Sequence, residues 1–185
     1  MAANNVSITA GAATNSGSTI RGNNLSMLAD NINNAGGGVL TGGAVQLAAA
    51  QDIRNSGSTI SGNNVTLAAG RDIVSEARIV GGNGVTRLGE TGGIAAADGL
   101  QMLAGRDVTL AGSRLAAGGD ARVSAGRDVN VTTVTTGSSF HGYHLDEDIT
   151  THHGSSVVVG GNLQMTAGND LTVAGSGVAA GGDAT

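Results

Sequence analysis

The sequence returns to nearly the same four residues, AGRD, at a regular interval. AGRD ends at Asp72, Asp107 and Asp128, the related AAQD ends at Asp52, and AGND ends at Asp170. The steps between these aspartates are 20, 35, 21 and 42 residues, so all but one equal one or two periods of about twenty. A chain with this self-similarity folds as a stack of like units. Stacking brings like charges together, so we expect each Arg of the motif to be offset by an adjacent Asp.

The residues before each aspartate alternate in polarity. Seven and five positions before it the residue is aliphatic, and the position between them is polar. The aliphatic residues are Val45, Val65, Leu100, Ala121 and Leu163, followed two positions later by Leu47, Leu67, Met102, Val123 and Met165. This is the period of a strand with one buried face, and no window shows the apolar spacing of a helix. We expect Leu67, Val123 and Val173 to point inward. Arg122, between two aliphatic positions, should point outward.

Glycine-rich segments separate about three short strands in each unit, as in AGGD at 117–120, VGGN at 159–162 and SGNN at 61–64. Glycine supplies positive φ at tight corners, and Asn or Asp side chains bond to the local backbone. Strands alone with a period near twenty are typical of a β-solenoid. The sequence therefore predicts an all-β, right-handed parallel β-helix of about 20 residues per coil. We expect about eight to nine coils and one β-hairpin-like protrusion.

The composition narrows the class of protein further. The chain of 185 residues has 33 Gly, one Phe and one Tyr, and it lacks Pro, Cys, Trp and Lys. A hydrophobic fraction of 39% with only 12% charged residues favours order over disorder. The net charge of −5, without a basic patch, argues against nucleic-acid binding. The absence of Cys excludes disulfides and thiolate metal sites. No signal peptide or membrane-spanning run is recognisable.

Two segments carry a family resemblance. They are AGRDVTLAGSRLAAGGDARVSAGRDVNV, from Ala104, and VVVGGNLQMTAGNDLTVAGSGVAAGGD, from Val157. Both resemble the haemagglutinin repeats of filamentous haemagglutinin-type exoproteins of two-partner secretion, which include the contact-dependent growth inhibition effectors. The resemblance implies a right-handed parallel β-helix in a long fibre, exported through an outer-membrane transporter to the surface of a Gram-negative bacterium. It is clearest over 100–185, and the repeats over 1–99 are looser.

The same resemblance sets expectations for domain organisation. The chain has neither the Asn-Pro motifs of a secretion domain nor a toxin-like C-terminal domain, and Met1 runs directly into a repeat-like segment. We therefore expect residues 1–185 to be a single β-helix segment of a longer protein. The step of 35 residues before Asp107 fits one full unit at Val85 and a short one, with an irregular corner at Arg87–Gly99.

A second break in the repeat is larger. The interval from Asp128 to Asn162 is thirty-four residues, whereas the matching interval from Asp107 to Asp120 is thirteen. The inserted segment, at about 132–156, contains all four His, the single Phe and Tyr, and an acidic run. Its Thr- and Val-rich flanks predict two strands of a hairpin or an oversized rung. Because recognition tends to lie on projecting loops of a rigid scaffold, we predict partner contact here. The predicted contact residues are Phe140, His141, Tyr143, His144, Asp146, Glu147, Asp148, His152 and His153.

Two chemical hypotheses for this insertion are weaker. Four His near three carboxylates have the residue types of a zinc or nickel site, and His beside an acid has those of general acid–base catalysis. The sequence fixes no ligand geometry, and no nucleophile or cleft stands out. We therefore expect no catalytic, cofactor-binding or metal-binding residue.

The favoured function is a structural shaft segment of a large secreted or surface-exposed adhesin or contact-dependent inhibition effector. Such a shaft presents or delivers other domains and mediates cell contact. Its expected partners are the two-partner secretion transporter, for the full-length protein, and a receptor on a host or neighbouring cell. Further copies, through end-to-end association, are also expected partners. The alternative is a β-helix enzyme that binds or cleaves polysaccharide, but the absence of Trp and Lys argues against it. An ice-binding solenoid would repeat Thr-x-Thr on one face, which this chain does not do.

Overall fold

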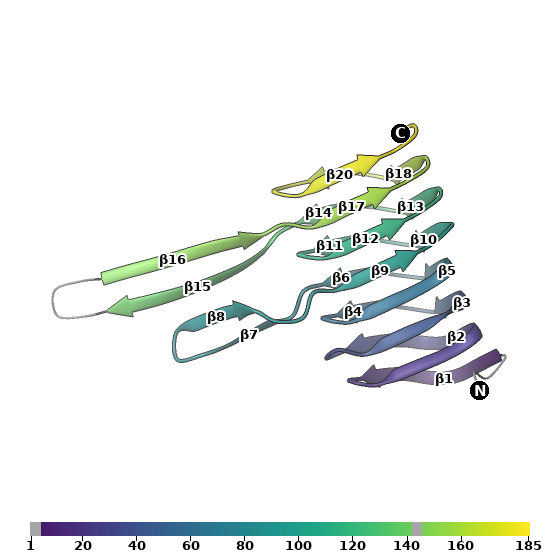
Figure 1. Ribbon diagram of the computed structural model, residues 1–185, viewed down its shortest axis with the longest axis horizontal. Coiled ribbons are helices and arrows are strands. Elements are labelled where there is room, and N and C mark those ends of the chain that lie inside the picture. The colour runs from purple at the N-terminus through teal and green to yellow at the C-terminus, as the bar shows by residue number, and fades with distance from the viewer. Residues whose placement is uncertain (1–4, 142–145) are drawn as a thin grey trace.

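The computed structural model describes residues 5–141 and 146–185 (Figure 1). All helical or extended elements in these residues are β-strands. In this described part no helix is long and apolar enough to span a membrane. Sixteen strands form one parallel sheet, and four form a separate antiparallel sheet. The strands are β1 (Asn5–Ser16), β2 (Thr19–Ala35), β3 (Val39–Ala49), β4 (Ile53–Ser56), β5 (Thr59–Ala69), β6 (Ile73–Glu76), β7 (Ile79–Gly82), β8 (Val85–Leu88), β9 (Gly93–Ala96), β10 (Leu100–Ala104), β11 (Val108–Ala111), β12 (Arg114–Ala117), β13 (Ala121–Ala125), β14 (Val129–Thr132), β15 (Val134–His141), β16 (Asp146–His153), β17 (Ser156–Val159), β18 (Leu163–Ala167), β19 (Leu171–Val173) and β20 (Gly177–Ala180).

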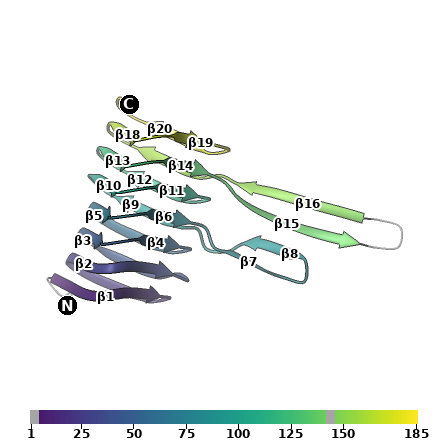
Figure 2. The same cartoon turned by 180° about the vertical axis from the view of Figure 1, so that it is seen from behind.

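The sixteen-stranded sheet, here called the shaft, winds about one axis in coils of three strands. In one coil, β12, β13 and β14 follow one another through tight corners. β12 pairs with β9 and β17, β13 pairs with β10 and β18, and β14 pairs with β11 and β19, all in parallel. Equivalent strands of successive coils therefore stack as three faces, which Figure 2 shows from behind. The predicted parallel β-helix is confirmed.

Stacked aliphatic side chains fill the shaft, in the register that the sequence predicted. One column joins Ile8, Met27, Leu47, Leu67, Met102, Val123 and Met165 through in-register strand pairs. Leu67 and Val123 are 0% exposed, while Arg122 points to solvent. Val173 stacks in register on the buried Val131, so it faces inward as expected. It is nevertheless 46% exposed, because it lies on the last coil of the described residues and no further strand covers it.

The number of coils is smaller than predicted. The column above has seven members, and β20 begins a further, partial coil within the described residues. The residues of β7 and β8, for which the sequence predicts a coil, leave the shaft as a hairpin and form no coil.

The corners need glycine for two different reasons, only one of which was expected. At Gly112 the backbone has a φ of 57°, a left-handed conformation that other residues rarely adopt. Gly126, in an AGRD corner, has no positive φ. A Cβ added there would lie only 2.2 Å from the carbonyl oxygen of Gly105 on the coil below. At this corner glycine allows close backbone approach between coils.

A ladder of polar side chains runs inside the shaft beside the aliphatic column. The Asn15 amide donates to Asn34 Oδ1 at 2.8 Å, and the Asn34 amide donates to Asn55 Oδ1 at 2.9 Å. The Asn55 amide then donates to Ser75 Oγ at 3.2 Å, and Ser75 hydrogen-bonds to Ser113 at 2.7 Å. All five side chains are buried. The ladder thus satisfies polar groups that would otherwise be costly inside a narrow core.

Two hairpins leave the shaft, where the sequence predicted one. β15 and β16 form the expected protrusion, and β7 and β8 form a second, shorter hairpin. The full coil predicted at Val85 is therefore wrong, since Val85 begins β8. The irregular corner predicted at Arg87–Gly99 is also wrong in part, because β8 ends at Leu88 and β9 spans Gly93–Ala96.

Candidate functional site: a wing made of two paired hairpins

Both hairpins emerge from the same corner of the coil. One follows β6 and returns to β9, and the other follows β14 and returns to β17. Figures 1 and 2 show them projecting from one side of the shaft. The corner between them, after β11, is closed by Gly112. A Cβ there would meet Val134 Cγ2 at 2.6 Å and Ala77 Cβ at 3.2 Å, so Gly112 lies between the bases of the two hairpins.

The two hairpins pair with each other into one antiparallel sheet in the order β16-β15-β8-β7, here called the wing. Ser138 of β15 lies opposite Val85 of β8. The amide of Gly137 donates to Thr86 Oγ1 at 2.7 Å, and the Thr86 hydroxyl donates to the Gly137 carbonyl at 3.2 Å. Segments fifty-one residues apart in sequence are therefore hydrogen-bonded in the wing.

The spacing of the hairpins explains why they form a continuous sheet. Each coil advances the shaft by one strand separation, about 4.8 Å. Each hairpin adds two strands to the wing. If every coil carried a hairpin, two wing strands would have to fit into the height of one coil. Because only every second coil carries one, each coil height holds one wing strand on average. The sheet spacing of the wing then matches the coil spacing of the shaft.

The shorter hairpin has a sequence signal that was overlooked. Its turn contains Asn83, with a φ of 54°, and Gly84, with a φ of 78°. Two successive residues with positive φ are typical of the tight type I′ hairpin turn, for which Asn-Gly is the preferred sequence. Asn83-Gly84 stands between the apolar pair Ile79-Val80 and Val85. That pattern predicts a hairpin at this position in place of the full coil that was expected at Val85.

The two faces of the wing differ in polarity. Val85 and Ile149 both lie opposite Ser138, so these residues share one face, and Val80 lies on it too through its pairing with Arg87. Ile149 is 50% exposed and Val80 is 36% exposed. The other face carries Thr86, Asp148 and Thr150 beside Gly137. The wing thus offers one partly apolar face and one polar face.

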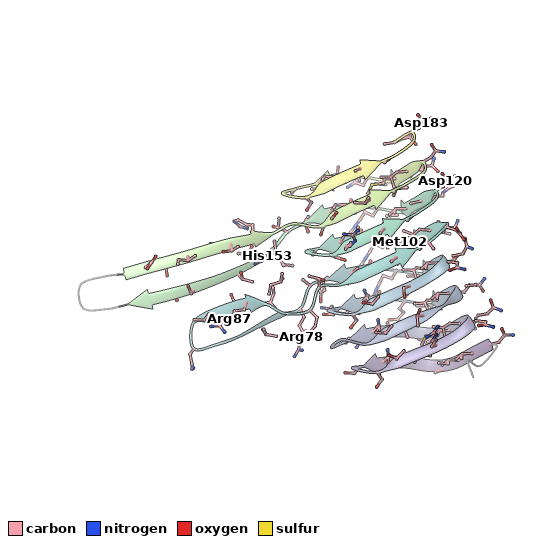
Figure 3. The ribbon with its side chains drawn as sticks, viewed as in Figure 1. Arg78, Arg87, Met102, Asp120, His153 and Asp183 are labelled. Carbon is pink, nitrogen blue, oxygen red and sulfur yellow. The ribbon has the colours of Figure 1, made fainter. Side chains whose placement is uncertain are left out.

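The predicted contact residues lie at the outer end and the base of the wing. Phe140 and His141 end β15, and Asp146 begins β16, although the side chains of these three lie outside the described part. Tyr143 and His144 lie outside the described residues altogether. Glu147, Asp148 and His152 are exposed on β16, and His153 is half-buried at its base (Figure 3).

The two described histidines bond to threonines of the neighbouring strand. His152 Nδ1 lies 3.1 Å from Thr135 Oγ1, and His153 Nε2 lies 2.9 Å from Thr136 Oγ1. Among the described side chains, which do not include those of His141 and Asp146, no three His, Asp or Glu are placed to hold a metal ion. His152 and His153 therefore help to hold the base of the long hairpin together.

A ladder of ion pairs runs outside the shaft, at the AGRD corner. Arg71 pairs with Asp52, Arg106 with Asp72 and Arg127 with Asp107, each across one coil. Each of these aspartates also accepts the backbone amide of the matching aspartate on the next coil at 3.2 Å. The motif therefore links neighbouring coils, as its expected structural role requires.

These pairs shift the ionisation of both partners. The hydrogen bond from the Arg71 guanidinium lowers the pKa of Asp52, and the one from Arg127 lowers the pKa of Asp107. The carboxylates in turn raise the pKa of Arg71 and Arg127. All of these groups stay charged at neutral pH. The ladder ends at Asn169, whose amide donates to Asp128 at 3.1 Å in place of an arginine.

The chain matches a known repeat family over most of its length. Three stretches, residues 29–78, 81–145 and 136–185, match the hemagglutinin repeat. The chain belongs to the hemagglutinin repeat family. The second and third stretches overlap within the long hairpin, so the matches include the wing as well as the shaft. The resemblance to filamentous haemagglutinin-type proteins is confirmed.

One curated relative is the 16S rRNA endonuclease CdiA of Enterobacter cloacae subsp. cloacae. The alignment, 105 positions long, is 37% identical and covers 49% of this chain and 3% of that protein. The chain thus corresponds to a small part of this relative's length. No solved structure matches the chain. The matched region is a structural repeat of a filamentous haemagglutinin-type protein.

Proposed function

We propose that this chain is a shaft segment of a large secreted or surface-exposed adhesin or contact-dependent inhibition effector of a Gram-negative bacterium. In this role the shaft presents or delivers other domains and mediates cell contact, and it catalyses no reaction itself. The observation that carries the proposal is the stack of in-register coils, a rigid rod whose length grows with each repeat. Family membership and the match to CdiA support it.

The proposal includes the wider protein. Residues 1–185 are one β-helix segment of a longer chain, with looser repeats over 1–99 and clearer ones over 100–185. A two-partner secretion transporter in the outer membrane exports the full-length protein. A chain without Cys suits such export, because no disulfide has to form or break on the way.

The wing is the proposed contact site for a receptor on a host or neighbouring cell. It projects from the rod and carries exposed Glu147, Asp148 and His152, as well as an exposed apolar Ile149. Surface sites of this kind, on loops held by a rigid scaffold, are where recognition concentrates. The predicted residues Phe140, His141, Tyr143, His144 and Asp146 belong to the same hairpin and to this proposal.

A deletion of the long hairpin tests the proposal. The chain already contains a Gly-Ser pair that can close the corner after the deletion. In the tight corner, Gly112 and Ser113 follow β11, and in the long hairpin Gly154 and Ser155 precede β17. Removing residues 133–153 joins β14 directly to Gly154-Ser155 and recreates the tight corner. We expect this variant to keep its β-helix and to lose binding to cells that the parent chain binds. Equal binding by the two folded proteins would contradict a contact role for the long hairpin.

The shaft role needs a separate test in a full-length exoprotein that contains this segment. Removing one whole coil that carries no hairpin, residues 53–72, should shorten the rod by one strand separation, about 5 Å, without abolishing secretion. A chain that catalyses a reaction at one fixed site would lose activity instead. Retained secretion and delivery after this deletion would support the shaft role, and loss of delivery by a normally secreted protein would contradict it.

A further inference from the structure

β16, one of the two outer strands of the wing, has a free edge in the part of the chain that the structure describes. β16 pairs with β15 along all eight of its residues, and no other described strand pairs with it. Its remaining backbone N–H and C=O groups therefore point away from the sheet. Such an edge is a template for a further strand unless side chains prevent pairing.

The side chains along β16 separate by charge. Glu147 and Asp148 lie near its outer end, and His152 and His153 lie near its base, with Ile149, Thr150 and Thr151 between them. Glu147, Asp148 and His152 are exposed. The strand thus has an acidic half and an imidazole half, arranged about Thr150.

We propose that the edge of β16 binds the same edge of a second copy of this chain, antiparallel and about a two-fold axis beside Thr150. Such an axis, perpendicular to the sheet, keeps each face of one wing continuous with the same face of the other. Asp148 then lies opposite the partner's His152, and Glu147 lies opposite the partner's His153. The two wings become one eight-stranded sheet between two shafts.

Hydrogen bonding favours this arrangement. His152 uses Nδ1 toward Thr135, which leaves Nε2 for the carboxylate of a facing residue. His153 uses Nε2 toward Thr136, which leaves Nδ1. Opposite charges on facing residues of antiparallel strands stabilise the pair, and like charges destabilise it. Symmetry produces each carboxylate–imidazole contact twice.

The same side chains disfavour other registers. A shift of the two-fold axis by two residues toward the outer end places Asp148 opposite the partner's Asp148. A shift by two toward the base brings the histidines together and leaves the carboxylates unpaired. The acidic residues therefore select the register of the dimer, and they also oppose pairing of this edge with unrelated strands.

The interface is small, so we expect association in the micromolar to millimolar range. The first test measures the oligomeric state by sedimentation velocity over that range. We expect a monomer–dimer equilibrium that saturates at the dimer. A strict monomer would overturn the proposal. Open-ended oligomers that are unchanged when Glu147 and Asp148 are replaced, as stacking through the exposed coil ends alone would give, would overturn it too.

A cysteine variant tests the position of the axis. The chain contains no Cys, so a single introduced thiol reports one contact. Thr150→Cys lies on the axis and should form a disulfide-linked dimer under mild oxidation. Ser139→Cys, an exposed residue of the adjacent strand, is the matched control and should not. Equal cross-linking of the two variants would overturn the proposed register.

Charge exchange tests the contacts themselves. The pair Glu147→Lys and Asp148→Lys should weaken the dimer by about tenfold or more. A fourfold variant that exchanges the two halves, Glu147→His, Asp148→His, His152→Asp and His153→Glu, should restore it. Circular dichroism shows whether each variant keeps its fold, and Glu147→Gln with Asp148→Gln is a milder pair for use if the Lys pair unfolds. A dimer that is indifferent to these changes would overturn the proposal.

Discussion

The guanidinium of Arg127 donates to both carboxylate oxygens of Asp107 on the coil below, with 2.9 Å between Nε and Oδ1. Asp107 Oδ1 also accepts the backbone amide of Asp128. A sequence motif that repeats along the chain has thereby become a column of contacts between coils. Arg127 also lies 3.1 Å from Asp128 on its own coil, but its hydrogen bonds to Asp107 join two coils, so the ladder stabilises stacking.

The ladder predicts loss of stability in acid. The pKa of Asp52 and of Asp107 is lowered in the folded chain, so their contribution is fully present above the unfolded value of about 3.9. It is lost as the pH falls through the folded values. We expect the melting temperature to fall below about pH 4, with a modest contribution from each pair because the arginines are about half exposed. Asp107→Asn should lower it at neutral pH, and the difference from the parent chain should shrink in acid. A difference that grows on acidification would contradict this role.

Substitution inside the core should be far more damaging than substitution outside it. Val123 is 0% exposed, and Arg122 beside it is exposed. Val123→Asp buries a charge without a partner and should cost several kcal/mol, roughly 3–5. Arg122→Gln should change the free energy of unfolding by no more than about 0.5 kcal/mol. Chemical denaturation of both variants measures the contrast, and equal losses would refute the register.

The buried amide ladder should be as sensitive as the aliphatic core. The Asn34 side chain donates to Asn55 Oδ1 and to the carbonyl of Thr59, and it accepts from Asn15. Asn34→Ala leaves these buried groups unpaired and should cost about 2–4 kcal/mol. Asn23→Ala, at an exposed position of the same strand, is the control. Similar denaturation midpoints for the two variants would show that the ladder adds no stability.

Close approach between coils makes one class of glycine irreplaceable. Gly126→Ala would place a Cβ 2.2 Å from the Gly105 oxygen, so the coils must separate or the corner must distort. We expect a loss of roughly 2–4 kcal/mol, typical of overpacking against rigid backbone. Gly82→Ala, on the wing, meets no atom within 4 Å and should be tolerated. Thermal melts of the two variants distinguish them, and tolerance of both would refute the close stacking at this corner.

The shaft could be predicted from the sequence because each of its signals recurs. The aliphatic positions, the polar positions between them and the AGRD corner each appear several times, so a single irregular copy does not hide the pattern. The second hairpin could not be found by counting, because its Ile and Val resemble those of a coil. Only the Asn83-Gly84 turn distinguishes it. The two hairpins can pair because they emerge from the same corner of the shaft on alternate coils. Their corners can be assigned only when the position of every coil in the stack is known.

The buried ladder was missed for a related reason. NSGSTI occurs at residues 15–20 and again at 55–60, but Asn is common at corners, and we expect it there from the sequence alone. Asn15 and Asn55 instead point inward, because each amide reaches the backbone carbonyl of Ser18 or Ser58 three residues later. The sequence correctly predicted the hairpin that carries the proposed contact residues. Their contacts with a partner remain a prediction.

The claim that hairpins leave the stack while the coils remain in register can be tested by one distance. Ser7, Ser26, Gln46, Thr66, Gln101, Arg122 and Gln164 occupy one outward column, so six coil rises separate its ends. Spin labels on Ser7→Cys and Gln164→Cys, measured by double electron–electron resonance, should give a backbone separation of about 29 Å once the label linkers are allowed for. If every twenty residues formed a coil, the separation would be about 38 Å. A narrow distribution near 29 Å is the predicted result, and one near 38 Å, or a broad one, would contradict the account.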